Sequence, residues 1–254
     1  MSASYSLTFL GVGAGLSPEL GNNNVLIEQA DGPAHLLVDC GPVTAQLLKA
    51  SGRLPDIRHA VLTHVHDDHV GGLQLWAQLN RYVYRHRPTL WYPEALWDEL
   101  WEGTLRGGLE RVNAADGMAG TAGLDAYFDL RPLKPGESLA LPGLPALTMR
   151  PTVHVPGKPC FGFYLGRDVY YSSDSQLMPP FEGIDGAPLR AIFQDCQLFD
   201  SPYAVHTSFN TLVRDLPDHL KPITRLMHYN EPPSLDAQAE GFWGFVPRHE
   251  KLWL

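Results

Sequence analysis

Cysteine, positive charge and long apolar runs are all scarce in this chain of 254 residues. Its three cysteines, Cys40, Cys160 and Cys196, lie far apart and form neither a paired zinc knuckle nor a disulfide framework. We therefore expect small buried thiols in a reducing compartment. No apolar run reaches membrane-spanning length, and the N-terminal residues lack the basic and apolar regions of an export signal. The expectation is a cytoplasmic protein without a membrane partner.

Basic residues are outnumbered, because 19 Lys and Arg stand against 28 Asp and Glu for a formal net charge of -9. This balance argues against a large nucleic-acid-binding surface, since phosphate backbones are bound by clustered Lys and Arg. No segment rich in Gly and Ser, and no run of charge, divides the sequence. We therefore expect residues 1–254 to form a single domain.

The densest cluster of reactive side chains is His64-Val-His66-Asp-Asp68-His69, which follows an apolar run typical of a buried strand. Imidazole suits zinc and its first-row neighbours, and a carboxylate adds the negative charge that lets a second divalent ion lie close by. A buried histidine needs partners for both ring nitrogens, which three bunched histidines without a metal would hardly find. This segment predicts a metal site.

Further ligand-type side chains recur where predicted strands end, namely His154, Asp174, Asp195 and His228. His206 precedes a helix predicted over residues 209–216, with Thr207 or Ser208 as its N-cap. Helices are also predicted over 41–52 and 71–79, the latter with its positive end toward the metal site. Strands and helices that alternate in this way are typical of a layered α/β protein.

Gly11, Gly13 and Gly15 follow the first predicted strand. They do not form a dinucleotide-binding fingerprint, because a Ser-Pro pair and an asparagine run follow them where that fingerprint has a helix. A tight turn between strands is the better interpretation. The amides of Asn22 to Asn24 are then available to line a pocket above it.

Residues 80–130 are predicted to be an insertion in the domain or a lid. Its Gly- and Ala-rich part from Gly103 to Tyr127 is typical of an irregular segment, and it is where substrate choice could reside. We interpret Trp91, Trp97 and Trp101 as core or dimer contacts rather than a base-stacking platform. A homodimer in which the insertion covers the neighbouring site is compatible with this pattern.

The order of these residues resembles the metallo-β-lactamase fold superfamily over nearly the whole chain. The segment from His64 to His69 matches its first ligand motif, and His154, Asp174 and His228 match the later ligands. The resemblance implies a four-layer αββα sandwich of the α/β class, with two divalent metal ions in the cleft between the sheet edges. Zinc is the expected metal, and Mn or Fe would suit the same ligands.

The resemblance also implies a role for each ligand. One ion would be held by His64, His66 and His154 and the other by Asp68, His69 and His228, with Asp174 and a hydroxide bridging them. Two nearby ions lower the pKa of that water, so the bridging hydroxide would be the nucleophile at neutral pH. Asp68 is accordingly expected to serve in catalysis as well as in metal binding.

Two further matches favour phosphodiesterases within the superfamily. Gln194-Asp195-Cys and Val205-His206-Thr-Ser resemble the acidic residue and histidine that act as a general-acid pair in tRNase Z and related enzymes. His206, oriented by Asp195, would protonate the leaving oxygen, which is typically worth about a hundred- to ten-thousandfold in rate. The pattern is also similar to the anti-Pycsar enzymes that open cyclic nucleotides. We therefore predict a metal-dependent hydrolase of a small phosphodiester, above all a cyclic nucleotide.

Other functions stay open. tRNase Z enzymes carry a substrate-clamping arm, commonly after the motif that His154 matches, but here only a predicted hairpin separates His154 from Asp174. A tRNA 3′-processing nuclease is thus less favoured than a hydrolase of a small substrate. A lactone or thioester hydrolase on the same fold would have little use for Asp195 and His206. A non-catalytic protein that binds metal is a further alternative.

Overall fold

The structure is a computed structural model that describes residues 4–113, 118–177 and 181–254. Its strands are β1 (Tyr5–Phe9), β2 (Val25–Gln29), β3 (His35–Val38), β4 (His59–Val61), β5 (Thr89–Pro93), β6 (Arg111–Asn113), β7 (Ala119–Thr121), β8 (Asp129–Leu133), β9 (Ser138–Leu139), β10 (Leu147–Pro151), β11 (Phe161–Leu165), β12 (Val169–Tyr171), β13 (Ala191–Asp195), β14 (Thr224–Met227), β15 (Gly244–Phe245) and β16 (Lys251–Trp253). Its α-helices are α1 (Pro42–Ala50), α2 (Asp67–Val70), α3 (Leu73–Leu79), α4 (Arg106–Leu109) and α5 (Phe209–Asp215). Short 3-10 turns and two π-helical segments are also present among the described residues.

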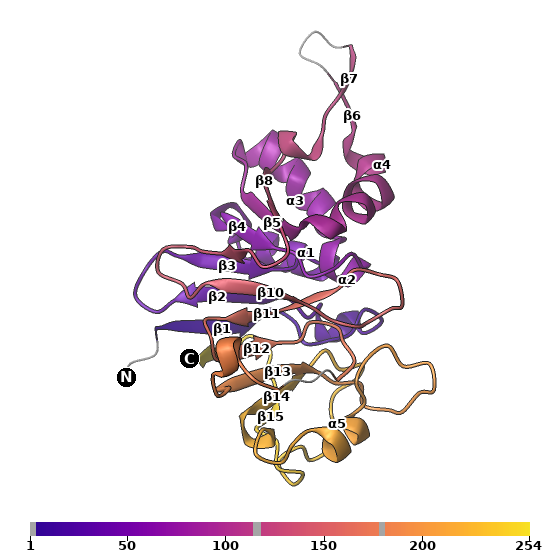
Figure 1. Cartoon of the computed structure of the whole chain (residues 1–254). Helices are drawn as coiled ribbons and strands as arrows, with labels where there is room; N and C mark the ends of the chain where they lie inside the picture. The colour runs from indigo at the N-terminus through magenta and orange to yellow at the C-terminus, as the bar shows by residue number, and fades with distance from the viewer. Residues whose placement is uncertain (1–3, 114–117, 178–180) are drawn as a thin grey trace.

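Two sheets make up the body of the molecule. In the described part of the chain, the first has seven strands in the order β16-β1-β2-β3-β4-β5-β8, and the second has seven in the order β15-β14-β13-β12-β11-β10-β9. The strands from β3 through β4 and β5 to β8 are parallel, as are those from β12 to β15. Figure 1 shows the two sheets lying against each other with helices outside them.

One apolar core fills the space between the sheets. In β2, Val25 and Ile27 belong to this core, whereas Leu26 between them packs against the helices on the outer face. All three side chains are fully buried, as in a strand that is covered on both faces. Phe163 and Tyr171 of the second sheet stack in the same core, with ring centroids 4.7 Å apart. Because this core joins both sheets, we propose that the sandwich is a single domain.

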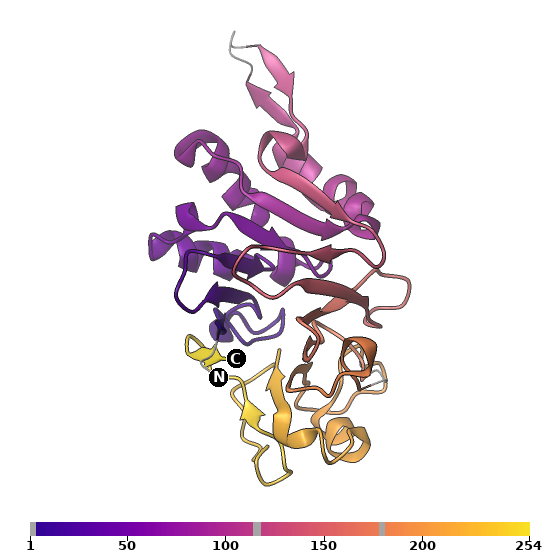
Figure 2. The same ribbon diagram turned by 60° about the vertical axis from the view of Figure 1, so that its left-hand side comes forward.

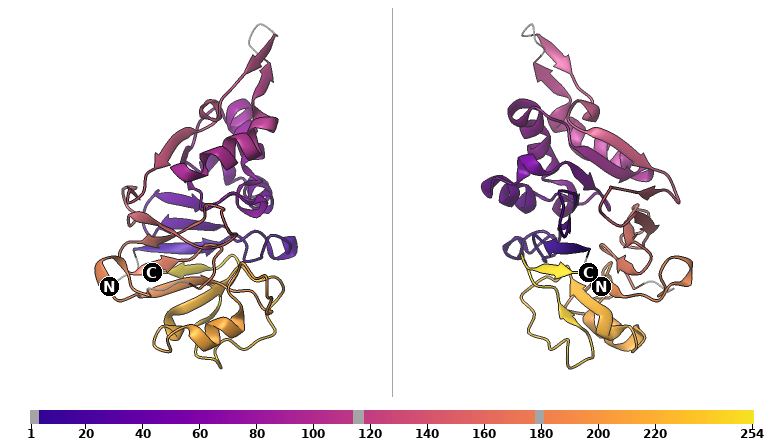
Figure 3. Two further views of the ribbon diagram at one scale, coloured as in Figure 1. Left: turned by 45° about the vertical axis from the view of Figure 1, so that its right-hand side comes forward. Right: turned by 90° about the vertical axis from the view of Figure 1, so that its left-hand side faces the viewer.

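Helices cover the outer face of each sheet. Leu48 of α1 and Trp76 of α3 pack with the first sheet, and Phe209 and Leu212 of α5 pack with the second. Figures 2 and 3 show these two groups of helices on opposite sides of the molecule. The layers are therefore helix, sheet, sheet, helix, and the αββα architecture is confirmed. Within the described ranges, no helix has the length and apolar character needed to cross a membrane.

The insertion at residues 80–130 is more ordered than the sequence indicated. It contains the π-helical segments η3 (Asn80–Tyr84) and η5 (Asp98–Leu105), then α4 and the β6–β7 hairpin, which projects from the sandwich (Figures 1 to 3). Residues 114–117, between those strands, lie outside the described residues. Trp101 is buried in the helical core and Trp97 stacks on it, with ring centroids 6.4 Å apart. Trp91 is partly buried against the core between the sheets, so all three tryptophans make core contacts as expected, whereas a lid or a dimer contact stays a prediction.

Candidate metal centre and active site

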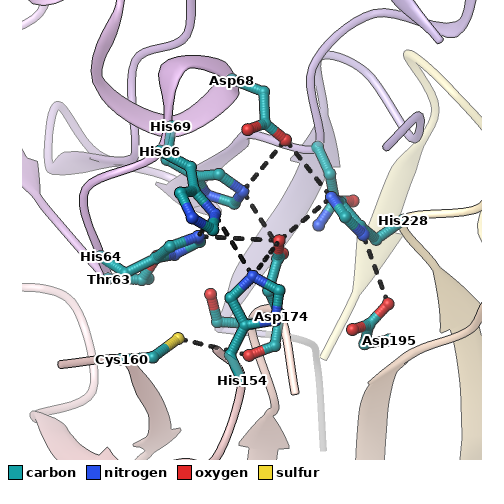
Figure 4. A network of polar contacts seen from close by, with 12 residues as sticks. Thr63, His64, His66, Asp68, His69, His154, Cys160, Asp174, Asp195 and His228 are labelled. Carbon is teal, nitrogen blue, oxygen red and sulfur yellow. Dashed lines mark hydrogen bonds and ion pairs between the residues drawn. The ribbon is translucent and has the colours of Figure 1, made fainter. Parts of the chain in front are cut away.

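The predicted site residues meet at one edge of the sandwich, where strands of both sheets end. In the second sheet, Asp195 is the last residue of β13, while Asp174 and His228 come soon after the parallel strands β12 and β14. The carboxyl ends of parallel strands share one edge, which is where ligands bind in open α/β sheets. His154 comes soon after β10, at the same edge (Figure 4).

The first sheet supplies the histidine motif. β4 is parallel to β3 and is followed by His64 and His66, and the chain then turns into α2, which carries Asp68 and His69. The helix predicted over residues 71–79, with its N-terminus toward the site, is therefore only partly as expected. The helical turn at the site is α2, and α3 begins only at Leu73.

Four side chains converge in a first cluster. Nδ1 of His66 lies 3.1 Å from Nε2 of His64 and 3.2 Å from Nε2 of His154. Oδ2 of Asp174 lies 3.6 Å from Nε2 of His64 and 3.8 Å from Nε2 of His154. Four ligand-type atoms at these separations surround a space suited to one ion.

A second cluster shares Asp174 with the first. Nε2 of His69 lies 3.3 Å from Oδ2 of Asp68 and 3.3 Å from Oδ1 of Asp174. Nε2 of His228 likewise lies 3.3 Å from Oδ2 of Asp68 and from Oδ2 of Asp174. Figure 4 shows these side chains pointing toward a common centre, with Asp174 between the two clusters. The structure thus brings together all seven residues predicted as ligands.

Two polar atoms at this centre test whether a metal fits. Nε2 of His69 and Oδ1 of Asp174 are buried and lie 3.3 Å apart, but neither atom makes a hydrogen bond of proper geometry with a described residue. Unpaired buried polar atoms are costly, and natural proteins seldom leave them so. Both atoms face the centre of the second cluster, where a divalent cation would coordinate them. The donor set of imidazoles and carboxylates fits such an ion.

Sequence reasoning missed Asp39, which orients one of the histidines. Oδ2 of Asp39 lies 2.7 Å from Nδ1 of His69 and accepts a hydrogen bond from Oγ1 of Thr63, also at 2.7 Å. Oδ1 accepts a second hydrogen bond from the backbone N–H of Thr63 at 2.8 Å. A carboxylate behind a ligating histidine fixes the orientation of the ring, so that Nε2 of His69, and not Nδ1, faces the centre.

His206 and Asp195 form a pair beside both clusters. Nδ1 of His206 lies 2.7 Å from Oδ2 of Asp195, and the other oxygen of Asp195 lies 3.3 Å from Nδ1 of His228. The ring of His206 is 4.6 Å from that of His154 and 4.9 Å from that of His228, centroid to centroid. Ser208, one of the two predicted caps, caps the following helix, since its Oγ accepts a hydrogen bond from N–H of Thr211.

Three non-glycine residues at the site have left-handed backbone angles. The φ values are 60° at Asp39, 53° at Ser173 and 60° at His228. Such angles are uncommon for residues with a side chain, and the surrounding structure has to hold them in place. Each of the three comes one or two residues after a strand, and the turns lie beside the ligand-type residues Asp174 and His228 and behind His69.

Burial and charge set the protonation states of the first cluster. Burial lowers the pKa of His154, and burial together with the neighbouring His154 lowers the pKa of His66 to about 4. Burial, reinforced by His69, lowers the pKa of His64 well below its usual value. Neutral imidazoles keep a lone pair, so these three rings are ready to bind a cation.

In the second cluster and the neighbouring pair, carboxylates oppose burial. Burial disfavours the charged form of His206, but the charge of Asp195 and its hydrogen bond outweigh burial and raise the pKa of His206. Burial also disfavours ionisation of Asp174, yet the charges of His228 and His69 hold its pKa well below the usual range. His206 is thus favoured as a proton donor and Asp174 as an anion.

The asparagine run does not line the pocket, and this part of the prediction was wrong. Asn22 to Asn24 are buried. Oδ1 of Asn24 accepts a hydrogen bond from N–H of Gly41, and Oδ1 of Asn22 accepts one from N–H of Val43, so both amides bind the first turn of α1. Nδ2 of Asn24 also donates to the carbonyl of Asp68 at 3.2 Å. The run therefore fixes the loop beside the metal ligands instead of contacting a substrate.

The glycine turn closes over the second cluster. A Cβ atom at Gly15 would lie 3.1 Å from Cγ of Asp68, which is closer than most such contacts. The turn thus forms one wall of a cavity of about 500 Å³ that contains His66, Asp68, His154, Asp174, His206 and His228. The cavity is therefore the candidate active site, and it is within the usual volume of small-molecule pockets.

Comparisons with known proteins agree with this arrangement. A family model described as "Anti-Pycsar protein Apyc1" matches residues 5–252. Proteins of that description from Paenibacillus harenae and Saccharibacillus brassicae are 36% and 35% identical over 229 and 227 residues, which cover 89% and 88% of this chain and 90% and 89% of the relatives. The crystal structure of the metallo-β-lactamase fold protein YhfI from Bacillus subtilis superposes with a TM-score of 0.70. It is 17% identical and covers 98% of both chains, which confirms the predicted fold.

Proposed function

The chain belongs to the anti-Pycsar Apyc1 family, and from this membership we propose that it hydrolyses cyclic nucleotides with the help of two divalent metal ions. It is a metal-dependent hydrolase with the metallo-β-lactamase fold, as its sequence indicated. The number of ions, the substrate and the role of each residue are parts of this proposal. The geometry of the cavity supports them.

The observation that carries the proposal is the position of Asp174 between two ligand clusters. One carboxylate within reach of both sets favours a pair of ions that share a ligand. His64, His66 and His154 would hold one ion, and Asp68, His69 and His228 the other. When bound, such a pair would polarise the phosphate and lower the pKa of a water molecule.

The chain's own contribution to the chemistry is the proton donor. Asp195 occupies Nδ1 of His206, which leaves Nε2 of His206 to carry a proton into the cavity. This nitrogen would give its proton to the oxygen that leaves when the phosphodiester bond breaks. A lactone or thioester hydrolase has less need of such a donor, so the pair favours a phosphodiester.

The cavity lining favours a substrate with a single phosphate. No Lys or Arg stands among the described residues that line the cavity. Cationic charge for the phosphate would therefore come from the metal ions and His206 alone. A nucleic-acid backbone or a pyrophosphate would bring further phosphates without a cationic side chain to meet them. A cyclic mononucleotide carries one phosphodiester charge and matches this lining.

Turnover assays of purified, metal-loaded protein test the proposal directly. The substrates are cyclic mononucleotides, cyclic dinucleotides, a pre-tRNA with a 3′ trailer, a lactone and a thioester. We expect ring opening of cyclic mononucleotides, abolished by a chelator and restored by a divalent ion. Exclusive turnover of the pre-tRNA or of the lactone and thioester would contradict the proposal. The cytoplasmic location and the homodimer remain predictions.

A further inference from the structure

Two large apolar side chains stand exposed at the mouth of the cavity. Leu16 is 98% exposed and Phe199 is 51% exposed, and both line the cavity that holds the ligand clusters. Leu16 belongs to the turn after β1 of the first sheet, and Phe199 to the segment after β13 of the second. The two side chains thus come from the two sheets that border the cleft.

Both segments are held by hydrogen bonds to their backbone groups, which support the exposed side chains. The N–H of Ala14 donates to the carbonyl of Tyr229 at 3.1 Å, and the N–H of Ser17 donates to the carbonyl of Ala14 at 2.9 Å. On the other side, Nε2 of Gln197 donates to the carbonyl of Phe199 at 2.6 Å. A fixed apolar surface costs less entropy when a ligand binds than a mobile one does.

Asn230 connects the two supports. Its carbonyl accepts a hydrogen bond from Oγ of Ser17, next to Leu16. Its side-chain Oδ1 accepts one from N–H of Leu198, next to Phe199, at 3.2 Å. One residue therefore holds both segments, and it follows the ligand-type residue His228 by two positions. Asn230 thus links the segment that carries Leu16 to the segment that carries Phe199.

Two polar side chains that line the cavity bind backbone groups. Nε2 of Gln197 and Oδ1 of Asn230 both bind backbone groups, as described above. The cavity lining also includes the apolar side chains of Val155 and Val205. Such a surface suits the flat face of a heteroaromatic ring, because base stacking on an aromatic side chain is driven by apolar contact.

We propose that Leu16 and Phe199 form the walls of a slot that binds the nucleobase, and that Asn230 is a positioning residue that sets the width of the slot. The inference rests on the proposed function, since it names the part of the site that would bind the base of a cyclic mononucleotide. The phosphate would lie deeper, at the ligand clusters. Base binding and phosphate chemistry are therefore separable by mutation.

Steady-state kinetics on two substrates test the walls. The substrates are a cyclic mononucleotide and a cyclic ribose phosphate that lacks a base. For Phe199→Ala and Leu16→Ala, we expect KM for the nucleotide to rise on the order of tenfold with kcat retained. Kinetics on the base-free substrate should not change. Tyr203→Ala is the matched control, because Tyr203 is 90% exposed yet does not line the cavity.

The positioning role of Asn230 has its own test. Asn230→Ala removes the acceptor for N–H of Leu198 and should raise KM for the nucleotide without lowering kcat. Asn230→Asp keeps an oxygen at that place and should restore KM. Metal content and melting temperature of each variant show whether it is folded. A fall in kcat on both substrates, with no rescue by Asp, would overturn the positioning role.

The results on the two substrates distinguish a failure of the slot hypothesis from a failure of the proposed function. Wild-type enzyme that hydrolyses both substrates with equal kcat/KM would overturn the slot while leaving the proposed function intact. Equal losses on both substrates in the wall variants would also overturn it, because the walls would then shape the metal centre. Wild-type protein that turns over neither substrate would overturn the proposed function, and the slot with it.

Discussion

Nδ1 of His206 lies 2.7 Å from Oδ2 of Asp195, whose carboxylate is fully buried and also accepts a hydrogen bond from N–H of Ser175. This contact fixes the imidazole ring and leaves Nε2 as its free nitrogen. It also accounts for the raised pKa of His206, because the charge of Asp195 outweighs burial. The proposed division of labour, metal ions for the phosphate and His206 for the leaving oxygen, depends on this pair.

Replacement of His206 tests the proton donor through the leaving group. For His206→Ala, we expect kcat on a cyclic nucleotide to fall about a hundred- to ten-thousandfold, since an alkoxide leaves poorly without a proton. On bis(p-nitrophenyl) phosphate, whose nitrophenolate leaves without protonation, the loss should be much smaller. Metal content should match that of the wild type. Equal losses on both substrates would remove the acid role from His206.

Replacement of Asp195 should have a broader effect than replacement of His206. Asp195 contacts His206 through one oxygen and His228 through the other, at 2.7 Å and 3.3 Å. Asp195→Ala should therefore lower both the turnover of cyclic nucleotides and the affinity for metal, because His228 loses the partner of its Nδ1. Isothermal titration with a divalent ion, compared with His206→Ala, measures the difference. Identical metal affinity in the two variants would contradict this assignment.

Asp39 provides a test of the support behind the second cluster. Asp39→Ala removes the partner of Nδ1 of His69 and should weaken metal binding roughly 10- to 100-fold, as is typical for such carboxylates. Asp67→Asn is a suitable control, because Asp67 is in the same motif but exposed. Metal titration of both variants gives the comparison. Wild-type affinity in Asp39→Ala would show that His69 does not need this partner.

The three thiols should be inert in the folded protein. Cys40, Cys160 and Cys196 are free and buried, which confirms the interpretation from sequence. Burial raises the pKa of Cys160 to about 12, and burial likewise raises the pKa of Cys40 and Cys196. Thiolate is the reactive form, so reaction with a disulfide reagent at pH 8 should be negligible until a denaturant is added. Rapid reaction in native buffer would contradict the buried positions.

The sequence was most informative where ligand-type side chains lie close together in the chain or directly follow an apolar strand. The segment from His64 to His69 places four ligand-type residues within six positions, and Asp174 and His228 each follow an apolar strand, so their residue types stand out. Parallel strands then bring them to one edge, which follows from topology alone. The four-layer sandwich was expected from the resemblance to the metallo-β-lactamase fold superfamily, which the order of these ligand-type residues carries.

The residues that the sequence did not reveal act over long separations. Asp39 is a lone carboxylate after β3, and its partner His69 lies 30 positions later, so no local pattern links them. The amides of Asn22 and Asn24 bind the start of α1, and this depends on how the loop folds back. The π-helical segments of the insertion were likewise unforeseen, because a helical period predicts a helix but not its hydrogen-bond register.

Metal analysis combined with activity tests the central claim most directly. Protein stripped by a chelator is titrated with a divalent ion, and bound metal and the rate of cyclic-nucleotide opening are measured at each point. We predict two ions bound per chain at saturation, with activity that follows their binding, and loss of both ions' tight binding in Asp174→Ala. Full activity in the stripped protein, or in Asp174→Ala, would contradict the account.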